Sequence, residues 1–140
     1  FYLLVLEWDI LGGGQSLNSM VGKYKIKAKI TPDLDVKDWE DYIICFNQIF
    51  KKGKDHTYFK RKYLLNPLGF SAHGILYFRD TIVGMVTMIP NTYIVKDSEK
   101  IIALTCDAFV LPEHRSDEHF LRKMAEVVYK LFVFEIKKQC

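Results

Sequence analysis

The stretch DAFVLPEHRSDEHF, residues 107–120, decides the fold of this chain. After Asp107, its residues 108–111 are apolar and end a strand-like run over residues 101–111. Pro112 then stops the strand, because proline has no N–H to donate to a sheet. From about Asp117 onward, apolar side chains recur at helical spacing, which predicts a helix with one broad apolar face. The members of that face are Phe120, Leu121, Met124, Val127, Val128, Leu131 and Phe132.

Upstream of this stretch the sequence predicts one strand and two helices. Residues 24–30 alternate apolar side chains with lysines, the pattern of a strand with one face in water. Asp35 can cap a helix that ends near residue 52, because its carboxylate can accept the free N–H groups of a first turn. A shorter helix is expected over residues 57–65, before a turn that contains Pro67.

Between the second helix and the deciding stretch, the sequence predicts an antiparallel hairpin over residues 73–89. Its two-residue turn is expected at Asp80-Thr81. Gly84 lies inside the second strand, where a missing side chain marks a bulge or a close approach of backbones. Beyond the hairpin, the strand either continues or restarts at residues 93–95.

Length and composition indicate one packed α/β domain. The chain has 140 residues, of which 49% are hydrophobic and 26% are charged, as in ordinary globular proteins. Residues 23–140 are expected to form a domain. Residues 1–22 are expected to be a leader or linker of uncertain origin, because their glycines lack the spacing of a dinucleotide-binding motif.

Charge and hydropathy exclude several classes of protein. A net charge of +3 does not provide the basic field of a dedicated nucleic-acid binder, so no nucleic acid is expected. Lysines cluster at residues 51–54 and 60–62; they form either a solvated surface or a weak attraction for an anionic ligand such as a nucleotide phosphate. The longest apolar run, residues 1–6, is too short to span a bilayer.

Cysteine and histidine spacing predicts neither disulfides nor a metal site. Three cysteines without C-x-x-C spacing indicate a reducing, cytoplasmic location. His114 and His119 are five residues apart, which would turn them about 140° from each other on a helix, so they cannot share a metal ion.

The element order and the deciding stretch resemble the GCN5-related N-acetyltransferases (the GNAT family). The strand-Pro-x-x-Arg-helix pattern of residues 107–120 looks like the family's fourth strand and acyl-coenzyme A loop. Residues 59–67 and 82–85 resemble a branch associated with sugar and surface-polysaccharide biosynthesis. The resemblance implies a GNAT-like three-layer α/β fold with a mixed, mostly antiparallel sheet, truncated after the third main helix. The fragment alone is then expected to be inactive.

The resemblance also implies a site for acetyl-CoA or another acyl-CoA, with no metal. In the family, backbone N–H groups at the start of the helix bind the pyrophosphate, aided by the helix dipole. The loop departs from the family pattern, because Glu118 stands where the family has its central glycine. An alternative interpretation is a plain helix start with Ser116 as its cap. The expected coenzyme-binding residues are Phe109, Val110, Leu111, Arg115, Ser116, Asp117, Glu118, His119 and Phe120.

Asp107 and Glu113 are the candidates for the general base, since an amine must lose a proton when it attacks a thioester. The function implied is transfer of an acetyl or similar group from acyl-CoA to an amine, for example on an amino sugar or another small-molecule acceptor. A homodimer is left open. The alternative function is a non-catalytic binding or scaffolding domain that has lost affinity for acyl-CoA, as the acidic loop suggests.

Overall fold

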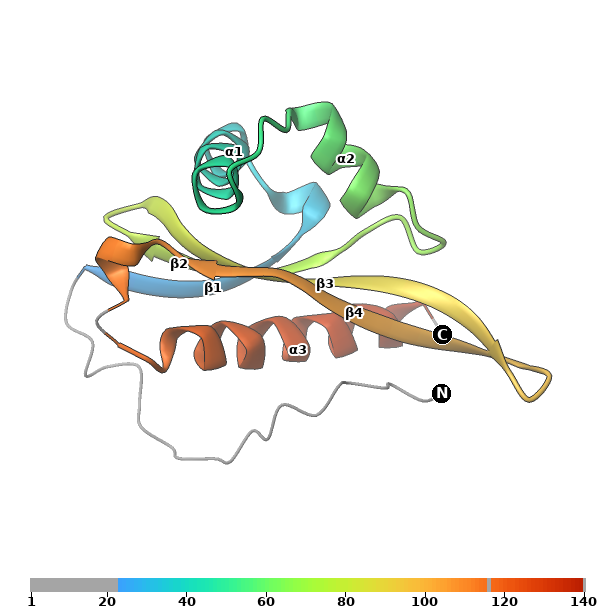
Figure 1. The fold of residues 1–140 in the computed structure, drawn as a ribbon. Coiled ribbons are helices and arrows are strands. Elements are labelled where there is room, and N and C mark those ends of the chain that lie inside the picture. Colours follow the sequence, from blue (N-terminus) through green and yellow to red (C-terminus); the bar gives the residue numbers. More distant parts are fainter. Residues whose placement is uncertain (1–22, 116, 140) are drawn as a thin grey trace.

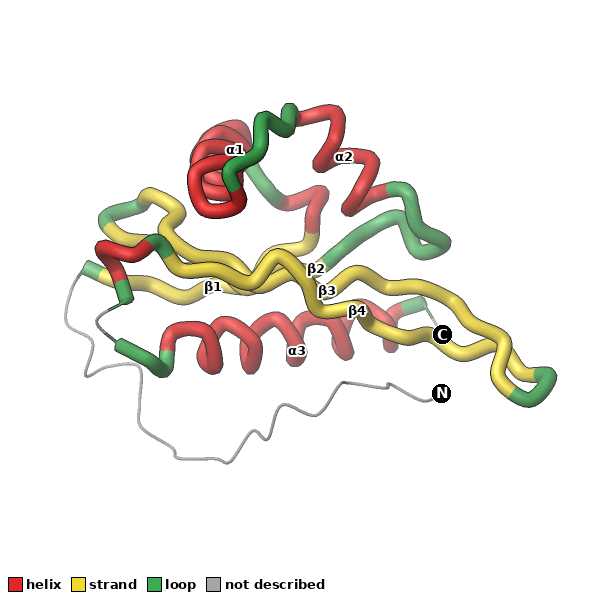
Figure 2. Tube along the Cα trace, in the orientation of Figure 1, coloured by secondary structure: helices red, strands yellow, loops and turns green. Residues whose placement is uncertain are grey.

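A four-stranded antiparallel sheet lies between two helical layers (Figures 1 and 2). The structure is a computed structural model that describes residues 23–115 and 117–139; the expected leader, residues 1–22, lies outside these residues. The strands follow the order of the sequence across the sheet and are β1 (Tyr24–Ile30), β2 (Ala72–Phe78), β3 (Thr81–Val95) and β4 (Ser98–Val110). Helices α1 (Val36–Phe50) and α2 (His56–Leu64) cover one face, and α3 (Phe120–Lys138) covers the other. The predicted α/β fold with a mostly antiparallel sheet is confirmed.

The two helices of the upper layer begin at acidic caps. Asp35 accepts a hydrogen bond from the backbone N–H of Asp38, and the Asp38 carboxylate accepts one from the backbone of Asp35. This capping box satisfies two N–H groups that the first turn leaves free. Asp55 caps α2 in the same way through the N–H of Tyr58. The predicted cap at Asp35 is therefore confirmed.

The two hairpins of the sheet close through left-handed turns. Arg79 and Asp80 have φ angles of 48° and 65°, and Lys96 and Asp97 have 49° and 64°. Two successive residues of this kind form the turn type that fits the twist of paired strands. The first turn lies one residue earlier than predicted, because a β-branched threonine resists positive φ and stays in the strand.

Strand β3 is continuous through Pro90, which settles the alternative that the sequence leaves open. Pairing with β2 ends at Met88, so beyond that point β3 has a neighbour only in β4. The missing N–H of Pro90 therefore costs no ladder hydrogen bond if it faces the side that β2 has left.

Two glycines let backbones approach closely. A Cβ atom built on Gly84 would lie 2.9 Å from the carbonyl oxygen of Phe109, and β2 and β3 shift register beside it. The close approach and the bulge predicted at Gly84 are both confirmed. Gly74 is tighter still, since a Cβ there would lie 2.3 Å from the backbone oxygen of Met124 in α3.

The sheet separates two apolar cores. The upper core joins α1 and α2 to the sheet, with Tyr42, Phe59 and Tyr63 almost completely buried. The lower core joins α3 to the sheet, with Met124 and Val128 fully buried, as the helical spacing predicts.

Helix α3 begins later than predicted. Its first helical residue is Phe120, after the short 3-10 helix η3 (Pro112–His114) and a turn, rather than about Asp117. His119 takes the capping position without a side-chain hydrogen bond. Asp117 accepts a bond from the N–H of His119 and so satisfies one free donor outside the helix. Ser116, the alternative cap, lies outside the described residues.

Candidate functional site

A bulge in β4 turns the Asp107 carboxylate toward the upper helical layer. Thr87 pairs with Cys106 and Met85 with Phe109, so Asp107 and Ala108 together face the single residue between those partners on β3. Asp107 has a φ angle of 53°, the left-handed conformation that marks one form of bulge. Two residues of β4 therefore occupy the space opposite one residue of β3, and the Asp107 side chain points toward α2.

Four polar side chains meet at this bulge and form what we term the Asp107 cluster: Asp107, Lys62, Tyr63 and Tyr42. Lys62 Nζ lies 2.9 Å from Oδ1 and 2.7 Å from Oδ2 of Asp107. The Tyr63 hydroxyl donates to Oδ2 at 2.6 Å, and Tyr63 shares a further hydrogen bond with the Tyr42 hydroxyl. The Asp107 side chain is only 10% exposed. Burial strengthens such charge-assisted bonds and fixes the carboxylate in position.

The cluster sets the protonation of its members. Burial works against the charge of Lys62, but the hydrogen bond and the negative charge of Asp107 outweigh it and raise the pKa of Lys62. Burial, with the charge of Asp107, also raises the pKa of both tyrosines, Tyr42 and Tyr63. The neighbouring Cys106 has its pKa raised to about 12, first by burial and then by Asp107. Lys62 is therefore an ammonium, the two phenols of the cluster are neutral, and the thiol of the neighbouring Cys106 is neutral as well.

Sequence reasoning identifies Asp107 but misses its partners. Lys62 and Tyr63 fall in the stretch 59–67 that carries part of the family resemblance, where neither is named as a partner of Asp107. Tyr42 belongs to an apolar helix face and shows no polar signal of its own. The available signal is that Asp107 is the only charged residue in the run 101–111, because a buried carboxylate needs cationic or hydroxyl partners.

The end of β4 presents backbone groups at an open edge of the sheet. The N–H of Leu111 donates to Val83 on β3. Because hydrogen-bonding direction alternates along a strand, the N–H and C=O of the preceding Val110 point away from β3. The Val110 carbonyl accepts a bond from Nε of Arg115 at 2.7 Å. The side chains of Phe109 and Val110 are buried in opposite cores, so these residues can offer only backbone to a ligand.

The remaining predicted coenzyme residues surround the start of α3. Arg115, Glu118 and His119 are exposed, and Asp117 is half-buried. The Glu118 side chain is 90% exposed and lies 3.9 Å from Nε2 of His119. Phe120 is buried against Tyr24, with ring centroids 4.9 Å apart, so it belongs to the lower core and has only its backbone to offer.

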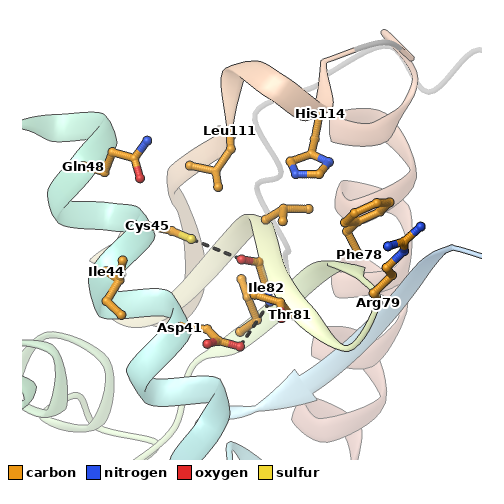
Figure 3. A pocket seen from close by; sticks show the side chains of 11 residues that line it. Asp41, Ile44, Cys45, Gln48, Phe78, Arg79, Thr81, Ile82, Leu111 and His114 are labelled. Atoms are coloured by element: carbon orange, nitrogen blue, oxygen red, sulfur yellow. Dashed lines mark hydrogen bonds between the residues drawn. The ribbon is translucent and has the colours of Figure 1, made fainter.

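Glu113, the second candidate base, is exposed in η3, which follows the end of β4. Next to η3 is an open groove of about 500 Å³ between α1, the β2–β3 turn and the end of β4 (Figure 3). His114 and Arg79 line it opposite Asp41 and Cys45. Burial raises the pKa of Cys45 to about 11, so its thiol is not a nucleophile there.

Two further findings bear on the expected absences. Among residues 23–115 and 117–139, no group of histidine, cysteine, aspartate or glutamate side chains is arranged to hold a metal ion. No helix in that part of the chain is long and apolar enough to cross a bilayer.

The antiparallel sheet with two helices above it and one below is similar to the fold of solved acetyltransferases. One is an aminoglycoside acetyltransferase from an uncultured soil metagenomic sample, in complex with trehalose: the TM-score is 0.55 and the identity 19%, over 83% of this chain and 72% of that one. Another is an acetyltransferase of Trypanosoma brucei: the TM-score is 0.57 and the identity 8%, over 79% and 77%.

A third similar structure is a conserved protein of unknown function from Enterococcus faecalis V583, described as a probable N-acyltransferase. The TM-score is 0.53 and the identity 13%, over 83% of this chain but only 27% of that one. No family model and no curated protein sequence matches the chain. At these identities the likeness establishes the fold.

Proposed function

We propose that the protein transfers an acyl group from acyl-CoA to an amine, with Asp107 as the general base. The observation that carries this proposal is the Asp107 carboxylate itself, which is nearly buried, hydrogen-bonded and placed by a bulge three residues before the open edge at Val110. The amine nitrogen attacks the thioester carbonyl and loses a proton to Asp107. Coenzyme A leaves as the thiolate and takes up a proton. The acceptor is a small molecule such as an amino sugar.

The open edge at Val110 and the start of α3 are the proposed coenzyme site. The outward N–H of Val110 suits a donor to the amide groups of the pantetheine arm. Arg115 and the positive end of the α3 dipole suit the pyrophosphate, because a helix N-terminus attracts anions. The residues that hold coenzyme are proposed to be those named from the sequence, with Phe109, Val110 and Phe120 acting through their backbone. Glu113 would then lie beside the coenzyme rather than beside the acceptor.

The test is Asp107→Asn in the full-length protein. Loss of a general base lowers kcat/KM for acyl transfer by about 10²- to 10⁴-fold. Because Asp107 lies away from the loop, the Kd for acetyl-CoA, measured by calorimetry, should change less than about threefold. Glu113→Gln is the matched control and should keep most of its activity. Equal losses in the two variants would remove Asp107 from this role.

The alternative is a binding module that keeps the fold without the chemistry, and Glu118 is the observation that favours it. Its carboxylate stands at the position of the family's central glycine, where a doubly anionic pyrophosphate would be repelled. Glu118→Gly removes that charge and frees the backbone to approach phosphate. A tighter Kd for acetyl-CoA in this variant supports a coenzyme site, and an unchanged or weaker Kd in a folded variant supports the binding module.

A further inference from the structure

Residues 51–62, the basic segment, hold the excess positive charge of the protein. They include six cationic side chains and one acidic one, Asp55, a net charge of +5 against +3 for the whole chain. Among the described residues, only Lys62 of these six forms an ion pair. Lys51, Lys52, Lys60 and Arg61 are exposed. The basic segment therefore has a positive potential that the protein itself does not neutralise.

Tyr58 links the basic segment to the Asp107 cluster. Lys54 Nζ lies 4.6 Å from the centre of the Tyr58 ring, and Lys62 Nζ lies 5.8 Å from the same centre. Two ammonium groups thus stand against one aromatic ring, and one of them contacts Asp107. The charge of Lys60 also acts on His56, the first residue of α2. The pKa of His56 is lowered by burial and, to a smaller extent, by the positive charge of Lys60.

The contacts between Lys62 and Asp107 weaken the attraction of the Asp107 cluster for cations. The charge of Asp107 is neutralised by Lys62, which touches both carboxylate oxygens. A polycationic acceptor would meet the basic segment with no free carboxylate to bind it. An acceptor with a negative group would gain from each ammonium that it approaches.

We propose that the acceptor amine belongs to a molecule that also carries an anionic group, a phosphate or a carboxylate, and that Lys54 with its neighbours in the basic segment binds that group. The inference rests on the proposed acyl transfer at Asp107 and adds the substrate class. The amine faces Asp107, while the anionic group lies beside Lys54 near Tyr58. Lys62 holds the base in place, and the positive field comes from the unpaired cations of the basic segment.

Three amino sugars that differ in charge provide the test. Calorimetry on the full-length protein, at low salt and without coenzyme, compares glucosamine, glucosamine 6-phosphate and muramic acid. At least one of the two anionic sugars should bind about tenfold more tightly than glucosamine, and added salt should reduce that advantage. A better phosphate probe identifies a phosphate site, and a better muramic acid identifies a carboxylate site. Glucosamine binding as tightly as both, or no binding of either anionic sugar at millimolar concentration, overturns the inference.

Lys54→Gln locates the effect, with Lys130→Gln on the exposed side of α3 as the matched control. Lys54→Gln should reduce the advantage of the anionic sugar by about threefold or more, and Lys130→Gln should leave it unchanged. Equal losses would mean a general charge effect and would overturn the site. The outcomes for the proposed function are separate. If acetyl-CoA neither binds nor reacts while the anionic preference remains, acyl transfer is wrong and the anion site stands. If glucosamine is acylated as well as its phosphate, acyl transfer stands and the anion site is wrong.

Discussion

Asp107 combines a strained backbone with a nearly buried charge at one residue. Its left-handed φ angle of 53° costs an ordinary side chain about 1 kcal/mol, a cost that aspartate bears better than most residues. The charge is balanced by Lys62, and the carboxylate accepts a hydrogen bond from Tyr63; these two residues of α2 lie 45 and 44 positions earlier in the chain. The sequence alone draws attention to the Asp107 carboxylate. It cannot show that the packing of α2 brings an ammonium and a phenol to it.

The hydroxyl chain of the Asp107 cluster predicts unequal effects for its two tyrosines. Tyr63→Phe removes the donor to Asp107 and also the partner of Tyr42, so it should lower the free energy of unfolding by about 1 to 3 kcal/mol. Tyr42→Phe leaves the bond to Asp107 intact and should cost about 1 kcal/mol or less. Urea denaturation of both variants checks this order. A larger loss in Tyr42→Phe would contradict the direction of the chain of bonds.

A second residue-scale prediction concerns pH and His73. This histidine is fully buried between the hydroxyls of Thr31 and Thr87, each 2.9 Å from a ring nitrogen, and burial lowers its pKa from 6.5 to about 3. Below pH 6.5, His73 takes up a proton in the unfolded chain but stays neutral in the folded protein. The free energy of unfolding therefore falls as the pH falls. The slope approaches about 1.4 kcal/mol per pH unit.

Urea melts at pH values from about 5 to 7 should show this slope in the natural protein and lose most of it in His73→Asn, although that variant is less stable throughout. The lowered pKa of Asp38 acts only at lower pH, since its ordinary value is 3.8. His56→Gln is the control, because His56 is exposed and should contribute less. An unchanged slope in His73→Asn would place the acid sensitivity elsewhere.

At the scale of elements, α3 is held against the sheet at Gly74. The helix backbone approaches β2 so closely that no side chain fits between them. Periodicity predicts which face of α3 is buried, and Met124 and Val128 confirm it. It does not predict where the helix begins, since the acidic residues before Phe120 fit a first turn as well as a loop. The choice depends on the path of η3 across the end of the sheet.

Gly74→Ala should therefore be far more damaging than its chemistry suggests. The added methyl group would meet the backbone oxygen of Met124, and α3 would have to move away from β2. We expect a loss of about 2 to 4 kcal/mol in free energy of unfolding, as for other overpacked cores. Gly53→Ala is the matched control: no atom lies within 4 Å of the added group, so the change should be close to neutral. Similar thermal melts for the two variants would contradict the close packing.

At the scale of the whole molecule, the two cores protect the sheet unevenly. The centre of the sheet has helices on both faces, whereas the far end of the β3–β4 hairpin projects beyond them (Figure 1). Ile94 is 81% exposed and Tyr93 is 51% exposed near that end, while Leu76 and Ile75 are fully buried. The layer order is the part of the fold that sequence predicts best, because strand alternation and helix periodicity each indicate a buried face.

Hydrogen exchange followed by mass spectrometry should reproduce this gradient. Peptides that cover β2 and the first half of β3 should exchange slowest, because their opening requires both cores to come apart. Peptides around Lys96-Asp97 should exchange fastest among the described strands, since few buried contacts hold that end. Uniform protection along β3 would show that the projecting hairpin is covered by something else.

Helix α3 follows all four strands in the chain, and this order affects how the sheet is covered during synthesis. Each strand pairs with its neighbour in the sequence, and short turns join β2 to β3 and β3 to β4, so the sheet can assemble while later residues are still being synthesised. The apolar underside of that nascent sheet has no cover until α3 has been translated and docks at Gly74. We therefore expect chaperones that bind exposed apolar surface to recognise this face before α3 docks. Substitutions that slow the docking of α3 should lower the yield of folded protein in cells more than their effect on equilibrium stability implies.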